Sequence, residues 1–160
     1  MTTPAATENN VSAFNIQRVY LKGASLEMPL APAIFLEQGE VGLEFNLATA
    51  ITPLTPIIYE VALRATVTAK LGDKVQFLAE VDQAGIFELI NIPQDQLQMA
   101  LEINAATILT PYLRSNITDL LQRATLPMFM LPEINWGAAF VEKQKALAAQ
   151  AAAEPARVVH

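Results

Sequence analysis

Residues 59–87 read YEVALRATVTAKLGDKVQFLAEVDQAGIF, and this stretch decides the fold. Apolar and polar residues alternate along residues 59–71, which is typical of a strand covered on one face. Gly72-Asp73 fits a two-residue hairpin loop, and the alternation resumes after it. The inward face of this hairpin is predicted to consist of Tyr59, Val61, Leu63, Ala65, Val67, Ala69, Leu71, Val75, Phe77, Ala79 and Val81.

The outward face of the hairpin is polar and charged, with one large exception. Leu78 falls in the outward set of the second strand, between Gln76 and Glu80. Single exposed leucines are ordinary on protein surfaces, so the pattern alone does not make Leu78 a binding residue.

Two more strands precede the hairpin. Alternation from about residue 14 to residue 26 predicts a first strand, which Met28-Pro29 ends. Alternation over residues 41–47 predicts a second strand. Gly85, inside the last strand, indicates either a bulge or the close approach of another backbone.

The hydrophobic period changes after Pro93, where apolar residues recur at spacings of three and four, as on the buried stripe of a helix. Pro111 within the stripe predicts a kink or a restart. The helix is expected to end near Arg123-Ala124, where a glycine would relieve a left-handed terminus and an alanine can displace it. Asn135 is placed to cap a final helix through its side-chain oxygen.

These elements predict an α+β fold class, with a four-stranded antiparallel sheet followed by two long helices. Residues 14–153 are expected to form a single domain, since the chain of 160 residues is long enough for one core and shows no internal repeat. Residues 1–13 and 154–160 are expected to be mobile tails.

The composition is apolar for a chain without a membrane-spanning run. Hydrophobic residues make up 52% and charged residues 16%, yet no apolar run approaches the roughly 18 residues that span a bilayer. The first ten residues do not resemble a secretory signal. The excess apolar surface therefore points to subunit interfaces or to a groove for partners. The formal net charge of -6 disfavours nucleic acid as a partner.

An enzyme needs groups that can act as nucleophile, base or metal ligand, and this chain has few. It has no cysteine, and its one histidine is His160, the last residue. Acidic residues are spread over predicted strands and loops without histidine partners. We therefore expect no catalytic residue, no metal site and no cofactor.

Four separated blocks carry a resemblance to a known family. They are IQRVYLKGASLEMPLAP at 16–32, the hairpin at 59–87, ILTPYLRSNITDLLQRATLP at 108–127 and LPEINWGAAF at 131–140. In this order they resemble the SecB family of bacterial protein-export chaperones. The resemblance implies a SecB-like fold assembled as a dimer of dimers, and a cytoplasmic, ATP-independent holdase. Such a protein binds unfolded secretory preproteins, keeps them translocation-competent and delivers them to the SecA motor without entering the membrane.

The resemblance also implies two binding sites. The SecA-binding positions match Glu27, Leu78 and Glu80, an apolar anchor flanked by carboxylates that would attract a basic partner. Another family contact position, commonly Asp, is Gly23 here, so weaker docking is expected. The client-binding positions match Ile34, Phe35, Leu36, Met128, Phe129, Met130, Trp136 and Phe140.

Each client position has an alternative interpretation. Methionines suit a surface that accepts many sequences, because their side chains repack easily. Trp136 and Phe140, at helical spacing, equally fit an ordinary core. A frequent family tryptophan in the crossover is replaced near Gly39, which predicts a shallower subsite.

Two rival functions remain open from the sequence. One is a SecB-like chaperone dedicated to a narrow client such as a toxin–antitoxin pair. The other is a small-molecule module, in which the apolar sheet face and the helices enclose a lipid-like ligand.

Overall fold

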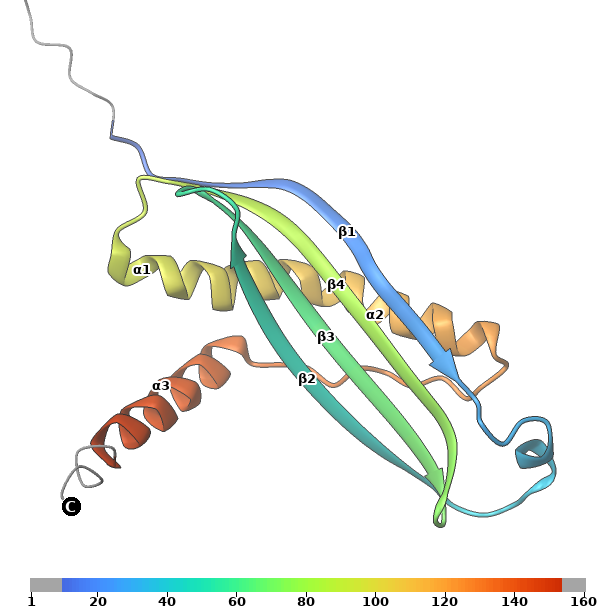
Figure 1. The fold of residues 1–160 in the computed structure, drawn as a ribbon. Coiled ribbons are helices and arrows are strands. Elements are labelled where there is room, and N and C mark those ends of the chain that lie inside the picture. Colours follow the sequence, from blue (N-terminus) through green and yellow to red (C-terminus); the bar gives the residue numbers. More distant parts are fainter. Residues whose placement is uncertain (1–9, 154–160) are drawn as a thin grey trace, which may run out of the picture.

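The structure of the chain is a computed structural model that describes residues 10–153. Four strands form one antiparallel sheet in the order β1-β4-β3-β2 (Figure 1). The strands are β1 (Ala13–Glu27), β2 (Val41–Pro53), β3 (Ile58–Leu71) and β4 (Lys74–Ile90). The predicted four-stranded sheet is confirmed. Of the tails expected at residues 1–13 and 154–160, residues 1–9 and 154–160, and with them His160, lie outside the described residues, and Ala13 already belongs to β1.

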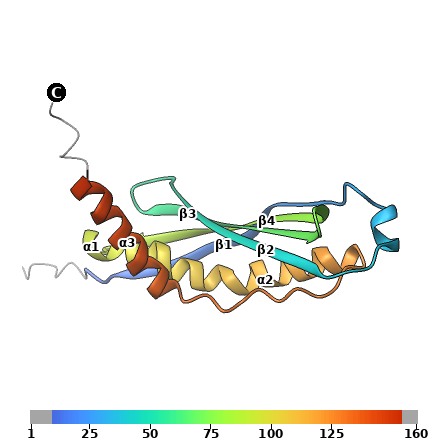
Figure 2. The same ribbon diagram turned by 90° about the horizontal axis from the view of Figure 1, so that it is seen from below.

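Two long helices follow the sheet, as predicted. The helical segments are α1 (Gln94–Met99), a π-helical segment η2 (Ala100–Ala105), α2 (Ala106–Arg123) and α3 (Trp136–Ala153). Helix α2 lies across one face of the sheet, the loop of residues 124–135 runs back beside it, and α3 projects beyond the sheet (Figures 1 and 2). The other face of the sheet is left uncovered by residues 10–153 (Figure 2).

The hairpin turns where the sequence predicts, but a bulge sets its register. Gly72 takes a φ of 61°, which glycine adopts without strain, and Leu71 pairs with Lys74 across the turn. Paired residues share a face, so this register alone would place inward residues of β3 opposite outward residues of β4. A register shift beside Ala69 absorbs one residue and brings the two inward faces together. Val75, predicted to face inward, is in consequence only half-buried.

The core lies between the inward face of the β3–β4 hairpin and one stripe of α2. The helix contributes an apolar residue at every fourth position, and each is essentially inaccessible to solvent. These residues are Leu109, Leu113, Ile117 and Leu121. They pack in one cluster with inward-facing residues of the hairpin such as Leu63, Val81 and Phe87. Burial of this stripe fixes the sheet on the helix.

Gly85 lies where side chains of the sheet and of α2 leave no room for a Cβ. A Cβ at this position would lie 2.8 Å from the Phe87 side chain and 3.0 Å from that of Leu109. The close approach at Gly85 is therefore made by side chains and not by another backbone. Gly85 pairs with Val61 of β3 and Val19 of β1 without a register shift at that position, although the β1 ladder shifts next to it, between Ile16 and Arg18.

The end of α2 differs from the expected cap. The helix ends at Arg123, but Ala124 keeps a negative φ of -91° and Thr125 takes the left-handed conformation, with a φ of 59°. The Thr125 amide donates to the Gln122 carbonyl, which satisfies one of the free carbonyls at the helix end. Pro111 lies inside α2 without dividing it, so the predicted restart is wrong.

The tight contact at Gly85 gives a direct test of the packing. Gly85→Ala is expected to lower the free energy of unfolding by about 2 kcal/mol, because the new methyl group overlaps the Phe87 ring and the Leu109 side chain. Urea unfolding at a fixed protein concentration measures the change.

The matched control is Gly42→Ala on β2, whose Cβ would meet only the Lys70 carbonyl at 3.9 Å. That change is expected to be neutral within about 0.5 kcal/mol. Equal effects of the two substitutions would show that chain entropy, and not contact with α2, governs Gly85.

Candidate functional site

The three predicted SecA-binding residues come together on the uncovered face of the sheet. Glu27 ends β1 and pairs directly with Leu78 on β4, so the two side chains share that face. Glu80 lies two residues further along β4 on the same face. We call Glu27, Leu78 and Glu80 the docking surface.

Leu78 is less exposed than the sequence pattern predicts. It is half-buried, since Glu27 on β1 and Thr68 on β3 flank it in the sheet. Glu27 is exposed and Glu80 is partly exposed. The surface is therefore shallow, with an apolar centre between two accessible carboxylates.

A charged cluster adjoins the docking surface along β4. Arg64 of β3 donates from Nε and Nη2 to the two oxygens of Asp82, over 2.6 and 2.7 Å. The same Nε lies 3.2 Å from Glu80 Oε1. These hydrogen bonds raise the pKa of Arg64 and lower the pKa of Asp82 below its usual value. Arg64 and Asp82 therefore stay charged at neutral pH.

A second polar cluster lies further along the same face. Lys22 Nζ donates to Glu60 Oε1 over 2.6 Å, and the Tyr20 hydroxyl donates to Glu60 Oε2. The hydrogen bond from Lys22, followed by that from Tyr20, lowers the pKa of Glu60. The bond to Glu60 raises the pKa of Tyr20 to about 12. Glu60 thus joins the edge strand β1 to β3, across β4.

The lowered pKa of Glu60 predicts a pH-dependent stability. A carboxylate with a lowered folded-state pKa stabilises the protein fully above its unfolded-state pKa, and this contribution is lost as the pH falls through the folded-state value. Glu60→Gln should therefore reduce the free energy of unfolding at pH 7, with the difference from the parent protein shrinking between about pH 5 and pH 2.

Urea unfolding at several pH values measures this difference. The control is Glu44→Gln, which removes a carboxylate from exposed β2, where Lys70 approaches only to 3.5 Å. A Glu60→Gln difference that stays constant with pH would contradict an ionised, hydrogen-bonded Glu60.

The predicted client residues lie on the crossover and on the segments that follow α2. In η1 (Ala33–Leu36), Ile34 is 2% exposed and belongs to the core, whereas Phe35 and Leu36 are 53% and 87% exposed. Lys74 Nζ holds the crossover to the hairpin tip by donating to Glu37 Oε1 over 2.5 Å. Two of the three predicted crossover residues are therefore available to a client.

The loop after α2 carries the next group. Met128 and Met130 are 64% and 66% exposed, and Phe129 between them turns inward against Phe45, with 6.1 Å between the ring centroids. Met128 and Phe129 line an apolar hollow of about 110 Å³. Its other lining residues come from the adjoining ends of β2 and β4 and include Leu43 and Phe77.

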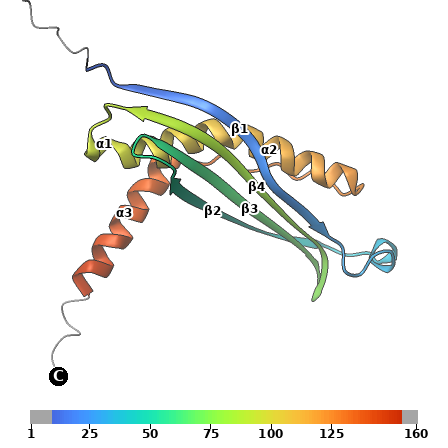
Figure 3. The same ribbon diagram turned by 45° about the horizontal axis from the view of Figure 1, so that its top comes forward.

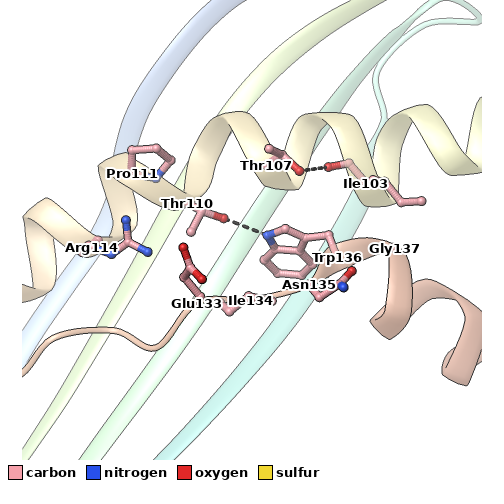
Figure 4. A pocket seen from close by; sticks show the side chains of 10 residues that line it. All are labelled: Ile103, Thr107, Thr110, Pro111, Arg114, Glu133, Ile134, Asn135, Trp136 and Gly137. Carbon is pink, nitrogen blue, oxygen red and sulfur yellow. Dashed lines mark hydrogen bonds between the residues drawn. The ribbon is translucent and has the colours of Figure 1, made fainter.

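Trp136 anchors the start of α3 on α2. Its indole Nε1–H donates to Thr110 Oγ1 over 2.9 Å (Figure 4). The Asn135 side-chain oxygen accepts from the Ala138 amide, which confirms the predicted cap. An open hollow of about 660 Å³ surrounds the indole. Lys143 makes a second contact, donating to Glu102 in η2 over 3.0 Å. Trp136 is half-buried, so it serves both packing and the lining of this hollow.

The predicted client residues form a line and not one pocket. The crossover lies at one end of the sheet and α3 at the other, with residues 124–135 running between them (Figures 1 and 3). Phe140 is half-buried on α3, which has no fully buried residue. The geometry fits an extended chain better than a compact ligand.

Some features of the site were missed by sequence reasoning. Arg64 and Asp82 were each assigned to the outward face, but their direct pairing depends on the bulge beside Ala69. Thr110 gave no signal as a partner for Trp136, because the two are 26 residues apart. The opposite charges of Arg64 and Asp82, on the outward faces of neighbouring strands, could have indicated that these two residues pair.

The described residues 10–153 contain no helix long and apolar enough to span a membrane. Within the same range, no group of three or more His, Cys, Asp or Glu side chains is arranged to hold a metal ion.

The subunit is an open α+β fold that exposes apolar side chains on the crossover and on the loop after α2, and two carboxylates beside Leu78 on the uncovered face of the sheet. Residues 7–147 match the family described as preprotein translocase subunit SecB. The chain belongs to the SecB family, which confirms the resemblance found in its sequence.

Relatives agree over most of the chain. A protein-export protein SecB of Paraburkholderia phymatum is 47% identical over 143 residues, which cover 89% of this chain and 92% of that relative. A protein-export protein SecB of Burkholderia vietnamiensis is 49% identical over 144 residues, covering 90% and 91%. These matches support an export chaperone.

A solved structure shares the fold. It is a SecB-like chaperone of Mycobacterium tuberculosis in complex with a ChAD peptide from an antitoxin, with a TM-score of 0.62 and 18% identity. The match covers 76% of this chain and 91% of that chain. At this identity the comparison supports the fold alone.

Proposed function

We propose that this chain is an ATP-independent holdase of protein export, which binds unfolded preproteins along its exposed apolar line and delivers them to the SecA motor. The proposal rests on the agreement between the family to which the chain belongs and the apolar side chains that its surface exposes. The relatives are named protein-export proteins, and this chain exposes large apolar side chains along one line. Its role is binding and not catalysis, and its place is the cytoplasm.

The client line runs from the crossover to α3. The exposed side chains of the client line are aliphatic or flexible, as in Leu36, Met128 and Met130. They require no particular hydrogen-bonding partner in the client. Burial of about 1,000 Å² of apolar surface contributes on the order of 25 kcal/mol before ordering and association costs, which offset most of it. Useful affinity then requires several contacts with the same unfolded chain.

A homotetramer, built as a dimer of dimers, supplies such contacts. Engagement of one client by several subunits raises affinity by a factor of about 10² to 10⁴ without sequence specificity. The chain has unpartnered surfaces suited to assembly: β1 is an edge strand of 15 residues with Ile16 and Leu21 about half exposed. Long apolar edge strands associate readily. Tyr112 on α2 is also half exposed.

Docking to SecA uses the opposite side of the sheet. Glu27 and Glu80 supply negative charge around Leu78, which suits a basic partner segment with an apolar contact at its centre. The docking surface lies on β1 and β4, and the client line follows the crossover, the loop of residues 124–135 and α3, so the two share no residue and a client and the motor can be held together. Residues 14–153 are proposed to perform both tasks as a single domain.

Native mass spectrometry of the purified protein, alone and with a chemically unfolded precursor, tests the holdase proposal. A species near four times 17.4 kDa that captures one unfolded chain is the expected result. A monomer that ignores the unfolded chain would overturn the proposal and favour the lipid-like ligand module.

The client line predicts the effect of a charge placed in it. Met128→Lys is expected to weaken capture of unfolded precursor about tenfold, because a cation in the hollow beside Phe129 must be desolvated when a client binds. Light scattering during precursor refolding measures the loss, and Glu142→Lys on exposed α3 is the control. If the Met128 variant captured precursor as well as the parent protein, the loop of residues 124–135 would not be part of the client line.

Substitutions in the docking surface are expected to impair SecA binding without impairing client capture. Leu78→Arg combined with Glu80→Lys is expected to abolish SecA binding in calorimetry, because two new cations face a basic partner. Client capture and the tetramer should be unchanged. Loss of the tetramer would instead assign these residues to assembly.

A chaperone dedicated to a narrow client is the second candidate. The relatives at 44–49% identity are named for protein export, which favours general export. Capture of several unrelated unfolded precursors with similar affinity would support this choice, and capture of one client only would reverse it.

A further inference from the structure

We propose that Asp82 is a positioning residue of the docking surface, which holds Arg64 so that Glu80 stays available to the basic partner. This inference rests on the proposed docking to SecA and deepens it. Asp82 was not among the residues that the family resemblance implied. Its role follows from the geometry of the sheet.

Arg64 is the nearest cation to Glu80 and would otherwise neutralise it. Its Nε lies 2.6 Å from Asp82 Oδ1 and 3.2 Å from Glu80 Oε1. Only Asp82 receives the two-pronged hydrogen bond, through Nε and Nη2. A guanidinium that donates two hydrogen bonds to one carboxylate is held in a fixed orientation, and that carboxylate compensates its positive charge.

The charges of the surface depend on this pair. Glu27, Glu80 and Asp82 carry negative charge and Arg64 carries positive charge, which leaves two negative charges uncompensated. Without the Asp82 carboxylate, Arg64 would pair with Glu80 and only Glu27 would remain uncompensated. Lys22, the other cation near Asp82, is already bound to Glu60 at 2.6 Å.

Gly23 places no side chain beside Asp82. Gly23 pairs with Asp82 across β1 and β4, and a Cβ there would lie 3.7 Å from Asp82 Oδ2. The two residues, with Ser25 and Glu80, line a hollow of about 200 Å³ beside the docking surface. The missing side chain on β1 thus leaves the carboxylate on β4 reachable from solvent.

The test is SecA binding by calorimetry with the full-length protein at several salt concentrations. Asp82→Asn is expected to raise Kd about two- to fivefold and to flatten the salt dependence, because one uncompensated charge is lost. Asp82→Asn combined with Arg64→Gln is expected to return Kd to within about twofold of the parent protein, because Glu80 is released again. A merely structural role for Asp82 predicts no such rescue.

The matched control is Glu44→Gln, which removes the same formal charge from β2 on the same face and should leave Kd unchanged. Unfolding midpoints of all variants report on folding. An unchanged Kd for Asp82→Asn would overturn the inference, as would a double variant as weak as the single one, since Asp82 would then contact the partner directly. Absence of binding by the parent protein would overturn the docking proposal itself, and this inference with it.

Discussion

The structure depends on the burial of one face of the β3–β4 hairpin under a single stripe of α2. The helix comes so close at Gly85 that a methyl group there would overlap Phe87 and Leu109. In the described residues 10–153, α2 covers one side of the sheet and no helix lies across the other side (Figure 2). A partner can therefore approach the uncovered face without competing for the core, while the segments after α2 remain free to line the client side.

The bulge beside Ala69 connects this core to the charged surface. It aligns the inward residues of β3 and β4, and the same shift places Arg64 opposite Asp82 and Thr68 opposite Leu78. One inserted residue thus sets both what is buried and which charges meet. The apolar residues of the sequence fall into two groups. Some fill the core, and others lie exposed on the edge strand β1, the crossover and the loop after α2.

The sequence was sufficient for the strands, the hairpin turn and the cap at Asn135, because each depends on local patterns with a known physical basis. The family resemblance grouped Glu27 with Leu78 and Glu80, and strand alternation placed Leu78 and Glu80 on the outward face. It did not reveal the π-helical turn at residues 100–105, nor the left-handed Thr125, since both depend on how the helix meets its neighbours. Ile34 was assigned to the client site and lies in the core, because its neighbours in sequence gave no sign of which side of η1 would turn inward.

Helix α3 is attached by its first half only, through Trp136 and Lys143, and has no fully buried residue. Eighteen residues of helix extend about 27 Å, and the ten residues beyond Lys143 account for about 15 Å of that length. This part of the helix extends past the two contacts that attach α3 to α2 and η2. Under the proposed function, these two contacts set where α3 borders the client path.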